Sequence, residues 1–289
     1  MKSRSIILLA LVGLLACKTT APTLQPNNIE TAMVKAMQWQ EANPIFAKAP
    51  TDWTNGAYYT GVSRAHQATK NPAFLKALQD MASRNEWKTW ERFYHADDVA
   101  ISYAYLYLQS MEAVGANLQP TAQWIDDHMN KPHDWRAGTR DDEKQILWWW
   151  CDALFMAPPV LAAFAKYKED PALLNQMHQY YKETYELLFD QEEQLFARDT
   201  RFQWKGNADD KKEPNGKKIF WSRGNGWVMG GLALLLDQLP KDFEHRNFYV
   251  ELYQKMAAKI KSIQPEDGLW RTSLLDPDSW DHGEVRAKV

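Results

Sequence analysis

The sequence has few cysteines, little glycine and no excess of charge of either sign. Its 289 residues include 2 Cys and 13 Gly, and 34 basic against 37 acidic residues give a formal net charge of −3. Two cysteines are too few for a disulfide scaffold or a multi-cysteine zinc site. The near-neutral charge provides no electrostatic footprint for nucleic acid, so we expect no nucleic-acid partner.

Tryptophan is the residue that the sequence has in excess. It contributes 14 residues, within an aromatic content of 13%. Flat indole faces are the surfaces that a sugar-binding cleft uses for stacking. A helical core that packs many aromatic side chains is the alternative, and composition alone does not separate the two.

Residues 1–17 predict a lipoprotein signal peptide. Lys2 and Arg4 precede an apolar stretch, residues 6–15, that is too short to span a bilayer as a stable helix. The segment ends in Leu-Leu-Ala-Cys17, which resembles a bacterial lipobox, where the signal is cleaved before the cysteine and the cysteine is acylated. The alternative is a plain secretory signal in which Cys17 is incidental.

The residues after Cys17 suggest where the protein is anchored. Lys18 follows the cysteine instead of Asp, so we expect an outer-membrane lipoprotein of a Gram-negative cell, periplasmic or surface-facing, held to the membrane only by its lipid. Residues 18–28 are expected to form a tether, and residues 29–289 a monomeric domain without cofactor or metal. If Cys17 is acylated, Cys151 is the only free thiol and no intrachain disulfide can form.

From residue 29 onward the apolar spacing is that of helices. A helix rich in small and aromatic residues is repeatedly followed by a Pro or Gly turn and a more charged helix. The predicted pairs are 56–68 with 73–84, 98–111 with 120–129, 152–168 with 172–189, and 226–239 with 243–263. This recurrence is an internal repeat of helix pairs.

The first helix of each pair is nearly free of charge in its middle, as in residues 153–165 and 228–236. Helices that are apolar all round have to be buried on all sides, which favours an inner ring surrounded by an outer ring. We therefore expect an all-α fold, an α/α toroid. In the loop 191–221, Pro214-Asn215-Gly216 predicts a turn that joins two short strands at the mouth of the barrel.

Three polar segments lie at predicted starts of inner helices and hence at one end of the toroid: residues 95–98, 148–152 and 221–227. An Asp at a helix start is an N-cap by default. Asp152, however, follows three tryptophans and precedes an apolar helix, so its carboxyl should be partly desolvated. Desolvation raises the pKa of a carboxyl, as a general acid working near neutral pH requires.

Arg223 stands between Trp221 and Trp227, where it can bind a substrate carboxylate in a bidentate manner. A buried structural ion pair is the competing interpretation of this arginine. The glycines at 224, 226 and 230 superficially imitate a dinucleotide loop, but no βαβ alternation follows them. An acid, a second carboxylate, an arginine and stacking indoles together indicate an enzyme that acts on an acidic sugar.

Four segments, HADDVAISYAYLYL, WWWCDALFMAPPVLA, FWSRGNGWVMGGLALLL and DGLWRTSLLDPDS, together resemble the unsaturated rhamnogalacturonyl hydrolases of glycoside hydrolase family 105, which are related to the unsaturated glucuronyl hydrolases of family 88. The resemblance covers residues 29–279 and implies an (α/α)6 barrel. It implies as substrate a lyase-generated pectin (rhamnogalacturonan) fragment with a 4,5-unsaturated uronic acid at its non-reducing end. The implied reaction is acid-catalysed hydration of the vinyl ether, with no metal.

The resemblance also implies roles for individual residues. Asp152 matches the general acid/base of the family. The second carboxylate falls on Asp98, with Asp97 as the alternative because the doubled Asp makes the alignment ambiguous. The further candidates for binding the substrate are Trp221, Arg223 and Trp227, which match the uronate-binding segment, with Asp97, His95 and Trp150 from the other two segments.

The sequence departs from the family pattern in two places. Many relatives carry a histidine in the loop after the third helix pair, where this chain has residues 196–202, so Arg198 or Asp199 is expected to take its place. The family continues beyond residue 279 into further helices, so we expect a C-terminally incomplete ring with exposed apolar surface. Two other functions stay open: an ordinary inverting glycosidase with Asp98 as base and Asp152 as acid, and a non-catalytic glycan-binding lipoprotein.

Overall fold

The computed structural model describes residues 25–45, 49–92, 95–113, 115–130 and 146–279. The predicted signal peptide with Cys17, most of the predicted tether and residues 280–289 lie outside the described residues. Helix α1 begins at Pro26, so the last residues assigned to the tether are helical. Among the described residues, no helix has the length and apolar character needed to cross a bilayer.

The described chain is mainly helical, as the sequence predicted. The α-helices are α1 (Pro26–Ala42), α2 (Trp53–Thr69), α3 (Pro72–Arg84), α4 (Ser102–Ser110), α5 (Gln119–Met129), α6 (Ala153–Met156), α7 (Pro158–Lys168), α8 (Pro171–Leu188), α9 (Ser222–Gln238) and α10 (Arg246–Ser262). The 3-10 helices are η1 (Ala96–Val99), η2 (Thr200–Phe202) and η3 (Pro277–Ser279), and the strands β1 (Phe189–Asp190) and β2 (Leu195–Phe196) pair antiparallel.

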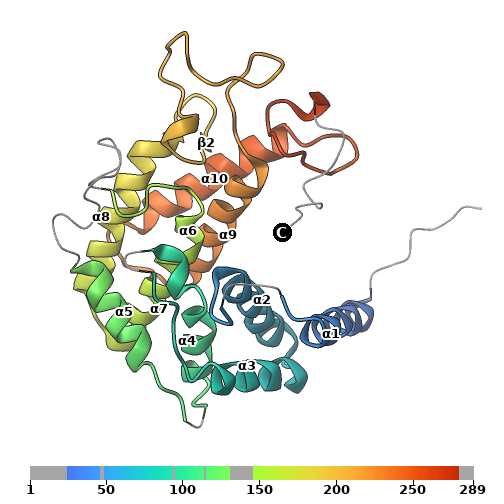
Figure 1. Ribbon diagram of the computed structural model, residues 1–289, viewed down its shortest axis with the longest axis vertical. Coiled ribbons are helices and arrows are strands. Elements are labelled where there is room, and N and C mark those ends of the chain that lie inside the picture. The colour runs from blue at the N-terminus through green and yellow to red at the C-terminus, as the bar shows by residue number, and fades with distance from the viewer. Residues whose placement is uncertain (1–24, 46–48, 93–94, 114, 131–145, 280–289) are drawn as a thin grey trace, which may run out of the picture.

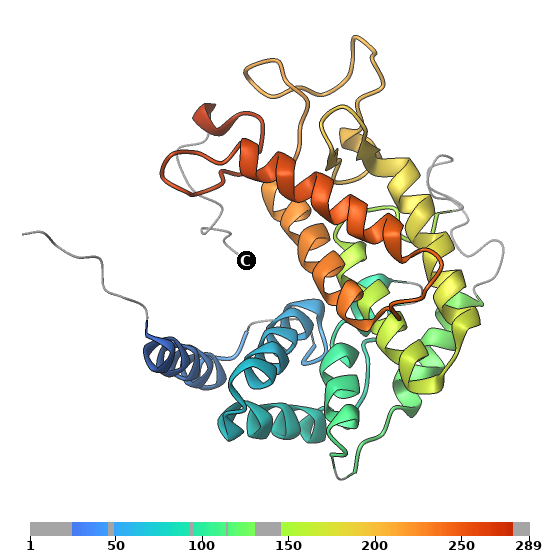
Figure 2. The same ribbon diagram turned by 180° about the vertical axis from the view of Figure 1, so that it is seen from behind.

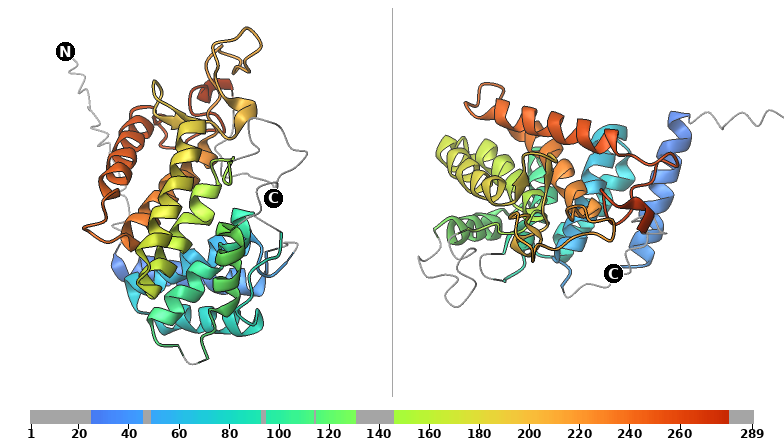
Figure 3. Two further views of the ribbon diagram at one scale, coloured as in Figure 1. Left: turned by 90° about the vertical axis from the view of Figure 1, so that its left-hand side faces the viewer. Right: turned by 90° about the horizontal axis from the view of Figure 1, so that it is seen from above.

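The helices are arranged in two layers along an arc (Figure 1). Helices α2, α4, α7 and α9 form the inner layer, where α4 packs on α2 and α7, and α7 packs on α9. Three of them are backed by an outer helix: α3 packs on α2, α8 runs alongside α7 (Figure 3, left), and α10 crosses the outer side of α9 (Figure 2). This is the predicted arrangement of inner and outer helices.

The hairpins α2–α3 and α7–α8 turn by the same local chemistry. Lys70 and Glu169 end the inner helices in the left-handed conformation, with φ of 59° and 54°. The next residue caps the outer helix: the Asn71 side chain accepts from the Ala73 N–H at 2.9 Å, and that of Asp170 from the Ala172 N–H at 3.0 Å. A proline at the first helical position follows in both, where its missing N–H costs nothing. These two helix pairs of the sequence repeat therefore share the same turn between their inner and outer helices.

Three inner elements begin or break differently from the prediction. Residues 152–168 form two helices, α6 and α7, because Pro158 and Pro159 cannot donate to the preceding turn. The helix predicted from Asp98 begins at Ser102, after the 3-10 turn η1. Helix α9 begins at Ser222, one turn earlier than predicted, which places Arg223 in its first turn.

The loop 191–221 also differs in detail. Its paired strands lie at the beginning, where Phe189 pairs with Phe196. Around the Pro214-Asn215-Gly216 turn a single bridge joins Lys212 to Lys218, so the two strands predicted there are reduced to one bridging pair. This turn is tied to the chain's later loop because the backbone N–H of Asn215 donates to Asp276 at 3.1 Å.

Candidate active site

The three polar segments predicted from the sequence meet in the structure. Helix α6, which Asp152 precedes, packs against η1 on one side and α9 on the other. The first carries His95 to Asp98 and the second carries Arg223 and Trp227. The site is therefore built from the N-terminal ends of neighbouring inner elements, which face the same end of the toroid.

The carboxyl of Asp152 does not cap the helix that it precedes. The residue is partly buried and makes no side-chain hydrogen bond to the first turn of α6. Its Oδ2 lies 3.5 Å from Sγ of the buried, free Cys151, which donates to it. Burial raises the pKa of Asp152, opposed by the Cys151 hydrogen bond and by the charges of Arg198 and Arg223. The competing structural role as an N-cap is not seen, and the raised pKa suits a proton donor.

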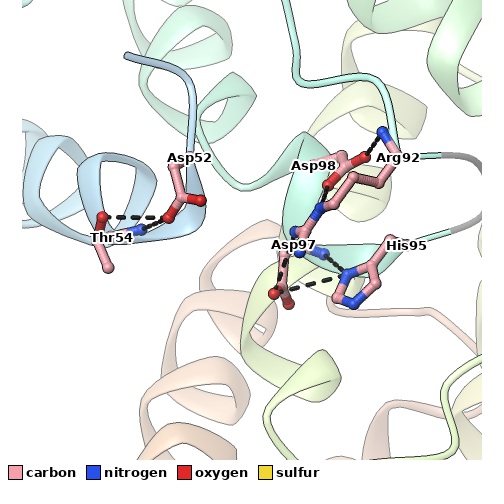
Figure 4. A network of polar contacts seen from close by, with 6 residues as sticks. All are labelled: Asp52, Thr54, Arg92, His95, Asp97 and Asp98. Carbon is pink, nitrogen blue, oxygen red and sulfur yellow. Dashed lines mark hydrogen bonds and ion pairs between the residues drawn. The ribbon is translucent and has the colours of Figure 1, made fainter. Parts of the chain in front are cut away.

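Asp98 is neutralised by Arg92. Its side chain is completely buried, its Oδ1 accepts from Nε of Arg92 at 2.8 Å, and its Oδ2 accepts from the Arg92 backbone N–H. Burial raises the pKa of Asp98 to about 6 and Arg92 lowers it in part. Both oxygens thus accept hydrogen bonds from Arg92, in the segment that precedes η1 (Figure 4). The sequence favoured Asp98 as the second catalytic carboxyl, and that role stays a prediction.

Asp97 lies close enough to Asp152 for the charge of Asp152 to act on its carboxyl. Its Oδ2 lies 3.3 Å from Nη2 of Arg92 and 3.5 Å from Nδ1 of His95. Its Oδ1 is buried and has no hydrogen-bond partner. Burial raises the pKa of Asp97 to about 7, Arg92 opposes this, and the charge of Asp152 adds to it. An unpartnered buried acceptor is rare in folded proteins and marks a place where another group is expected to donate.

His95 and Trp150 lie at the edge of this pair. The two rings are 4.7 Å apart and tilted, and the His95 side chain remains 33% exposed. Burial and the neighbouring Arg92 lower the pKa of His95 to about 4, so the imidazole is neutral at neutral pH. It can accept or donate a hydrogen bond at the open edge of the site without adding charge.

Arg223 and the two tryptophans beside it form the other wall. The guanidinium carbon of Arg223 lies 4.5 Å from the centre of the Trp221 ring. The Trp227 ring meets Phe155 at 4.7 Å and Trp53 at 5.9 Å, which fixes its orientation. The structure therefore brings together the arginine and both indoles that the sequence predicted.

The start of α9 is held in place by two close contacts. A Cβ atom on Gly224 would lie 2.9 Å from Sγ of Cys151 and 2.8 Å from the Trp221 ring, so glycine permits α9 to approach the acid segment. The Asn225 side chain accepts from the N–H of Phe196 at 2.8 Å and donates to its carbonyl at 3.0 Å. The glycine-rich motif thus allows α9 to pack closely against its neighbours.

Asp199 lies below the surface of the site. Its side chain is fully buried and forms ion pairs with Arg198 and Arg201. Although burial acts to raise the pKa of Asp199, the hydrogen bonds and charges of these arginines hold it below its ordinary value. The substrate contact expected for Asp199 stays a prediction: its carboxylate is paired with both arginines, whose side chains are 39% (Arg198) and 47% (Arg201) exposed.

Sequence reasoning missed Arg92 and Trp53. Arg92 precedes Asp97 and Asp98 by one to two helical turns in a segment without helical periodicity, so only its charge could have indicated a pairing. Trp53 is distant in sequence from Trp227 and carries no motif. Among the described residues, no group of three or more His, Cys, Asp or Glu side chains is arranged to hold a metal ion.

Carboxyls, an arginine and indoles at the mouth of an α/α toroid define a carbohydrate-active hydrolase, and the comparisons with known proteins agree. Residues 27–285 match the profile of Glycosyl Hydrolase Family 88, and the chain belongs to this family. It is thus a glycoside hydrolase, as the sequence predicted.

Individual relatives support both the family and the fold. The unsaturated 3S-rhamnoglycuronyl hydrolase of Formosa agariphila is 57% identical over 266 residues, which cover 91% of this chain and 71% of the relative. A protein of the same name from an Alteromonas species is 30% identical, over 96% of this chain and 77% of the relative. The solved structure of a family 88 glycosyl hydrolase from Bacteroides vulgatus superposes with a TM-score of 0.74 at 25% identity, over 88% and 73% of the two chains. The predicted α/α toroid is confirmed.

Proposed function

We propose that this protein removes the 4,5-unsaturated uronic acid from the non-reducing end of lyase-generated oligosaccharides. The observation that carries the proposal is the Asp152 carboxyl, which is partly buried, does not cap its helix and has a raised pKa. Arg223 and Arg198 provide positive charge beside it for an acidic sugar. The name of the relative at 57% identity supports the same type of substrate.

The proposed reaction is a hydration. Protonated Asp152 donates its proton to C4 of the double bond, and positive charge develops over C5 and the ring oxygen. A water molecule adds its oxygen to C5 and gives a proton to the Asp152 carboxylate, which restores the acid. The hemiketal opens as the bond from C5 to the ring oxygen breaks, C5 becomes a ketone, and the hemiacetal at C1 then expels the next sugar. One water molecule is consumed.

We assign the second carboxyl role to Asp97 instead of Asp98. Asp97 lies close to Asp152, and its unpartnered Oδ1 can accept a hydrogen bond from a sugar hydroxyl. Because two nearby carboxyls resist ionising together, the charge of Asp152 adds to the raised pKa of Asp97. Asp98 holds Arg92, which in turn orients Asp97.

The sugar next to the uronate is rhamnose in this proposal. The relatives at 57% and 30% identity are named for a 3S-rhamnoglycuronyl substrate, which supports a rhamnose that carries a sulfate. The pectin fragment implied by the sequence resemblance is the alternative, and a more distant relative from Bacillus subtilis, 23% identical, is named an unsaturated rhamnogalacturonyl hydrolase.

The test follows the ultraviolet absorbance of the conjugated unsaturated uronate. The full chain is incubated with unsaturated disaccharides made by lyases from sulfated rhamnose-containing and pectic polysaccharides, and with the saturated counterparts. We expect the absorbance to fall with at least one unsaturated substrate and no cleavage of the saturated ones. Cleavage of saturated substrates would instead support the inverting glycosidase, and binding without turnover would support a glycan-binding protein.

We further propose that the protein is an outer-membrane lipoprotein of a Gram-negative cell. The lipobox-like ending of residues 1–17 and Lys18 support this placement. Substrates would then be fragments that reach the cell envelope after a lyase has acted on the polymer.

A further inference from the structure

The ring of Trp221 is flanked by a second arginine besides Arg223. The guanidinium carbon of Arg198 lies 5.8 Å from the ring centre, compared with 4.5 Å for Arg223. Both arginines are also close enough to Asp152 for their charges to act on its carboxyl. Arg198 comes from the loop after β2 and Arg223 from the first turn of α9, so two separate elements place a guanidinium at the same wall.

Arg198 is firmly anchored at this position. Its Nη1 is paired with the completely buried carboxylate of Asp199, which also accepts from Nε of Arg201 at 2.8 Å. Its backbone carbonyl accepts from the N–H of Cys151 at 2.9 Å, and Trp150 pairs with Asp199 in an isolated bridge. The loop that carries Arg198 is thus attached directly to the segment that carries the acid, Asp152.

Within the part of the chain that the structure describes, the ion pairs of this loop do not balance in charge. The single carboxylate of Asp199 faces two guanidinium groups, those of Arg198 and Arg201, which leaves one positive charge in excess. In the proposed reaction Asp152 is the proton donor, and it does not supply the missing negative charge while it holds that proton. The Arg198 side chain keeps 39% of its surface exposed, and a guanidinium retains further N–H donors after pairing with one carboxylate. An anionic group of a ligand can therefore bind there.

We propose that Arg198 is a specificity-determining residue that binds a sulfate ester on the sugar next to the unsaturated uronate. This inference rests on the proposed function, in which Arg223 binds the uronate carboxylate. A second guanidinium at the same wall provides a place for a second anionic group of the substrate. A sulfate ester is charged at every physiological pH and presents several oxygens to the planar fork of an arginine.

The experiment compares two substrates and two variants. The substrates are the unsaturated disaccharide with a sulfated rhamnose and the same disaccharide after desulfation. The variants are Arg198→Gln and, as a matched control, Arg64→Gln. Arg64 is similarly exposed, at 42%, and similarly paired with an aspartate, Asp237 at 2.6 Å, but lies in α2 far from its N-terminal end. KM and kcat are measured separately for each pair.

We expect the wild type to prefer the sulfated disaccharide through a lower KM. Arg198→Gln should raise KM for the sulfated substrate about tenfold or more, the effect of one charged hydrogen bond, and change KM for the desulfated substrate about twofold at most. Arg64→Gln should leave the preference unchanged. Arg198→Lys keeps the charge beside Asp199 and should retain part of the preference, which provides a second variant if the glutamine variant does not fold.

Three results would overturn the proposal. Equal losses on both substrates in Arg198→Gln would show that this arginine acts on the uronate or on Asp152. A wild type that consumes both disaccharides with the same KM would show that the sulfate is not recognised, whatever the variants do. Consumption of neither disaccharide by the wild type would also overturn the sulfate site, and the proposed function fails with it if the pectic unsaturated disaccharide is left intact as well.

Discussion

Nε of Arg92 donates to Oδ1 of Asp98 across 2.8 Å, and Asp98 has no solvent-exposed surface. The same guanidinium lies 4.1 Å from the centre of the Trp90 ring and reaches Oδ2 of Asp97 through its Nη2. One arginine therefore holds a buried carboxylate for stability and orients the neighbouring carboxylate toward the site. The two adjacent aspartates therefore have different roles.

Asp97→Asn and Asp98→Asn should have different effects. Asp97→Asn is expected to reduce kcat with little loss of thermal stability, because Oδ1 of Asp97 makes no structural hydrogen bond. Asp98→Asn should lower the free energy of unfolding by about 2 kcal/mol, since it weakens a buried charged hydrogen bond to Arg92. Chemical denaturation and steady-state kinetics on both variants check this. An inactive Asp98→Asn variant with wild-type stability would return the catalytic role to Asp98.

Asp152→Asn should reduce kcat by about 10²- to 10⁴-fold while the fold remains intact, because the amide has the same shape but no transferable proton. The measurement is kcat for the unsaturated disaccharide, with circular dichroism to verify folding. Asp209→Asn, at an exposed position, is the matched control and should be fully active. Wild-type rates in Asp152→Asn would refute the mechanism.

Arg223→Ala should act mainly on KM. Removing the guanidinium deletes charged hydrogen bonds to the uronate, which corresponds to a rise in KM of about 10- to 100-fold. The Asp152 acid is retained, so kcat should change much less. An unchanged KM would leave Arg223 with a purely structural role against Trp221.

The pKa shift of Asp97 predicts a pH dependence of stability. Its folded-state pKa of about 7 lies above the unfolded value near 4, so the folded state binds more protons between these values. The contribution of Asp97 to the free energy of unfolding is fully present below about pH 4 and is lost as the pH rises to about 7. His95, with its pKa lowered to about 4, acts in the opposite direction over part of this range.

The comparison of melting temperatures between wild type and Asp97→Asn isolates the contribution of Asp97, because His95 is present in both. We expect the melting temperature of the wild type to fall relative to that of the variant as the pH rises from about 4 to about 7. A constant difference across this range would contradict the raised pKa.

Cys17→Ala should release the protein from membranes if Cys17 carries the lipid. The test is fractionation of cells that express the full chain, with metabolic labelling by a fatty-acid analogue. A variant that remains in the membrane fraction would contradict the lipobox prediction.

The sequence by itself determined the helix pairs, their inner and outer character and the motifs at the helix starts. These features depend on local interactions: the 3.6-residue apolar period, and the Asn71-Pro72 and Asp170-Pro171 turns, whose capping bonds form within a few residues. The family resemblance, the α/α toroid and the hydrolase class were therefore predictable, and the comparisons confirm them.

The packing of the folded chain determines which of two adjacent aspartates keeps an unpaired oxygen and which residue of the 198–199 pair is exposed. Asp97 and Asp98 have the same chemistry and the same local sequence, and they differ because Arg92 occupies both oxygens of Asp98 but leaves Oδ1 of Asp97 without a partner. Likewise, Asp199 is buried because Arg198 and Arg201 surround it. Whether a side chain is buried or ion-paired depends on segments distant in sequence or on the direction in which a turn presents that side chain. Neither of these two causes leaves a periodic pattern in the sequence.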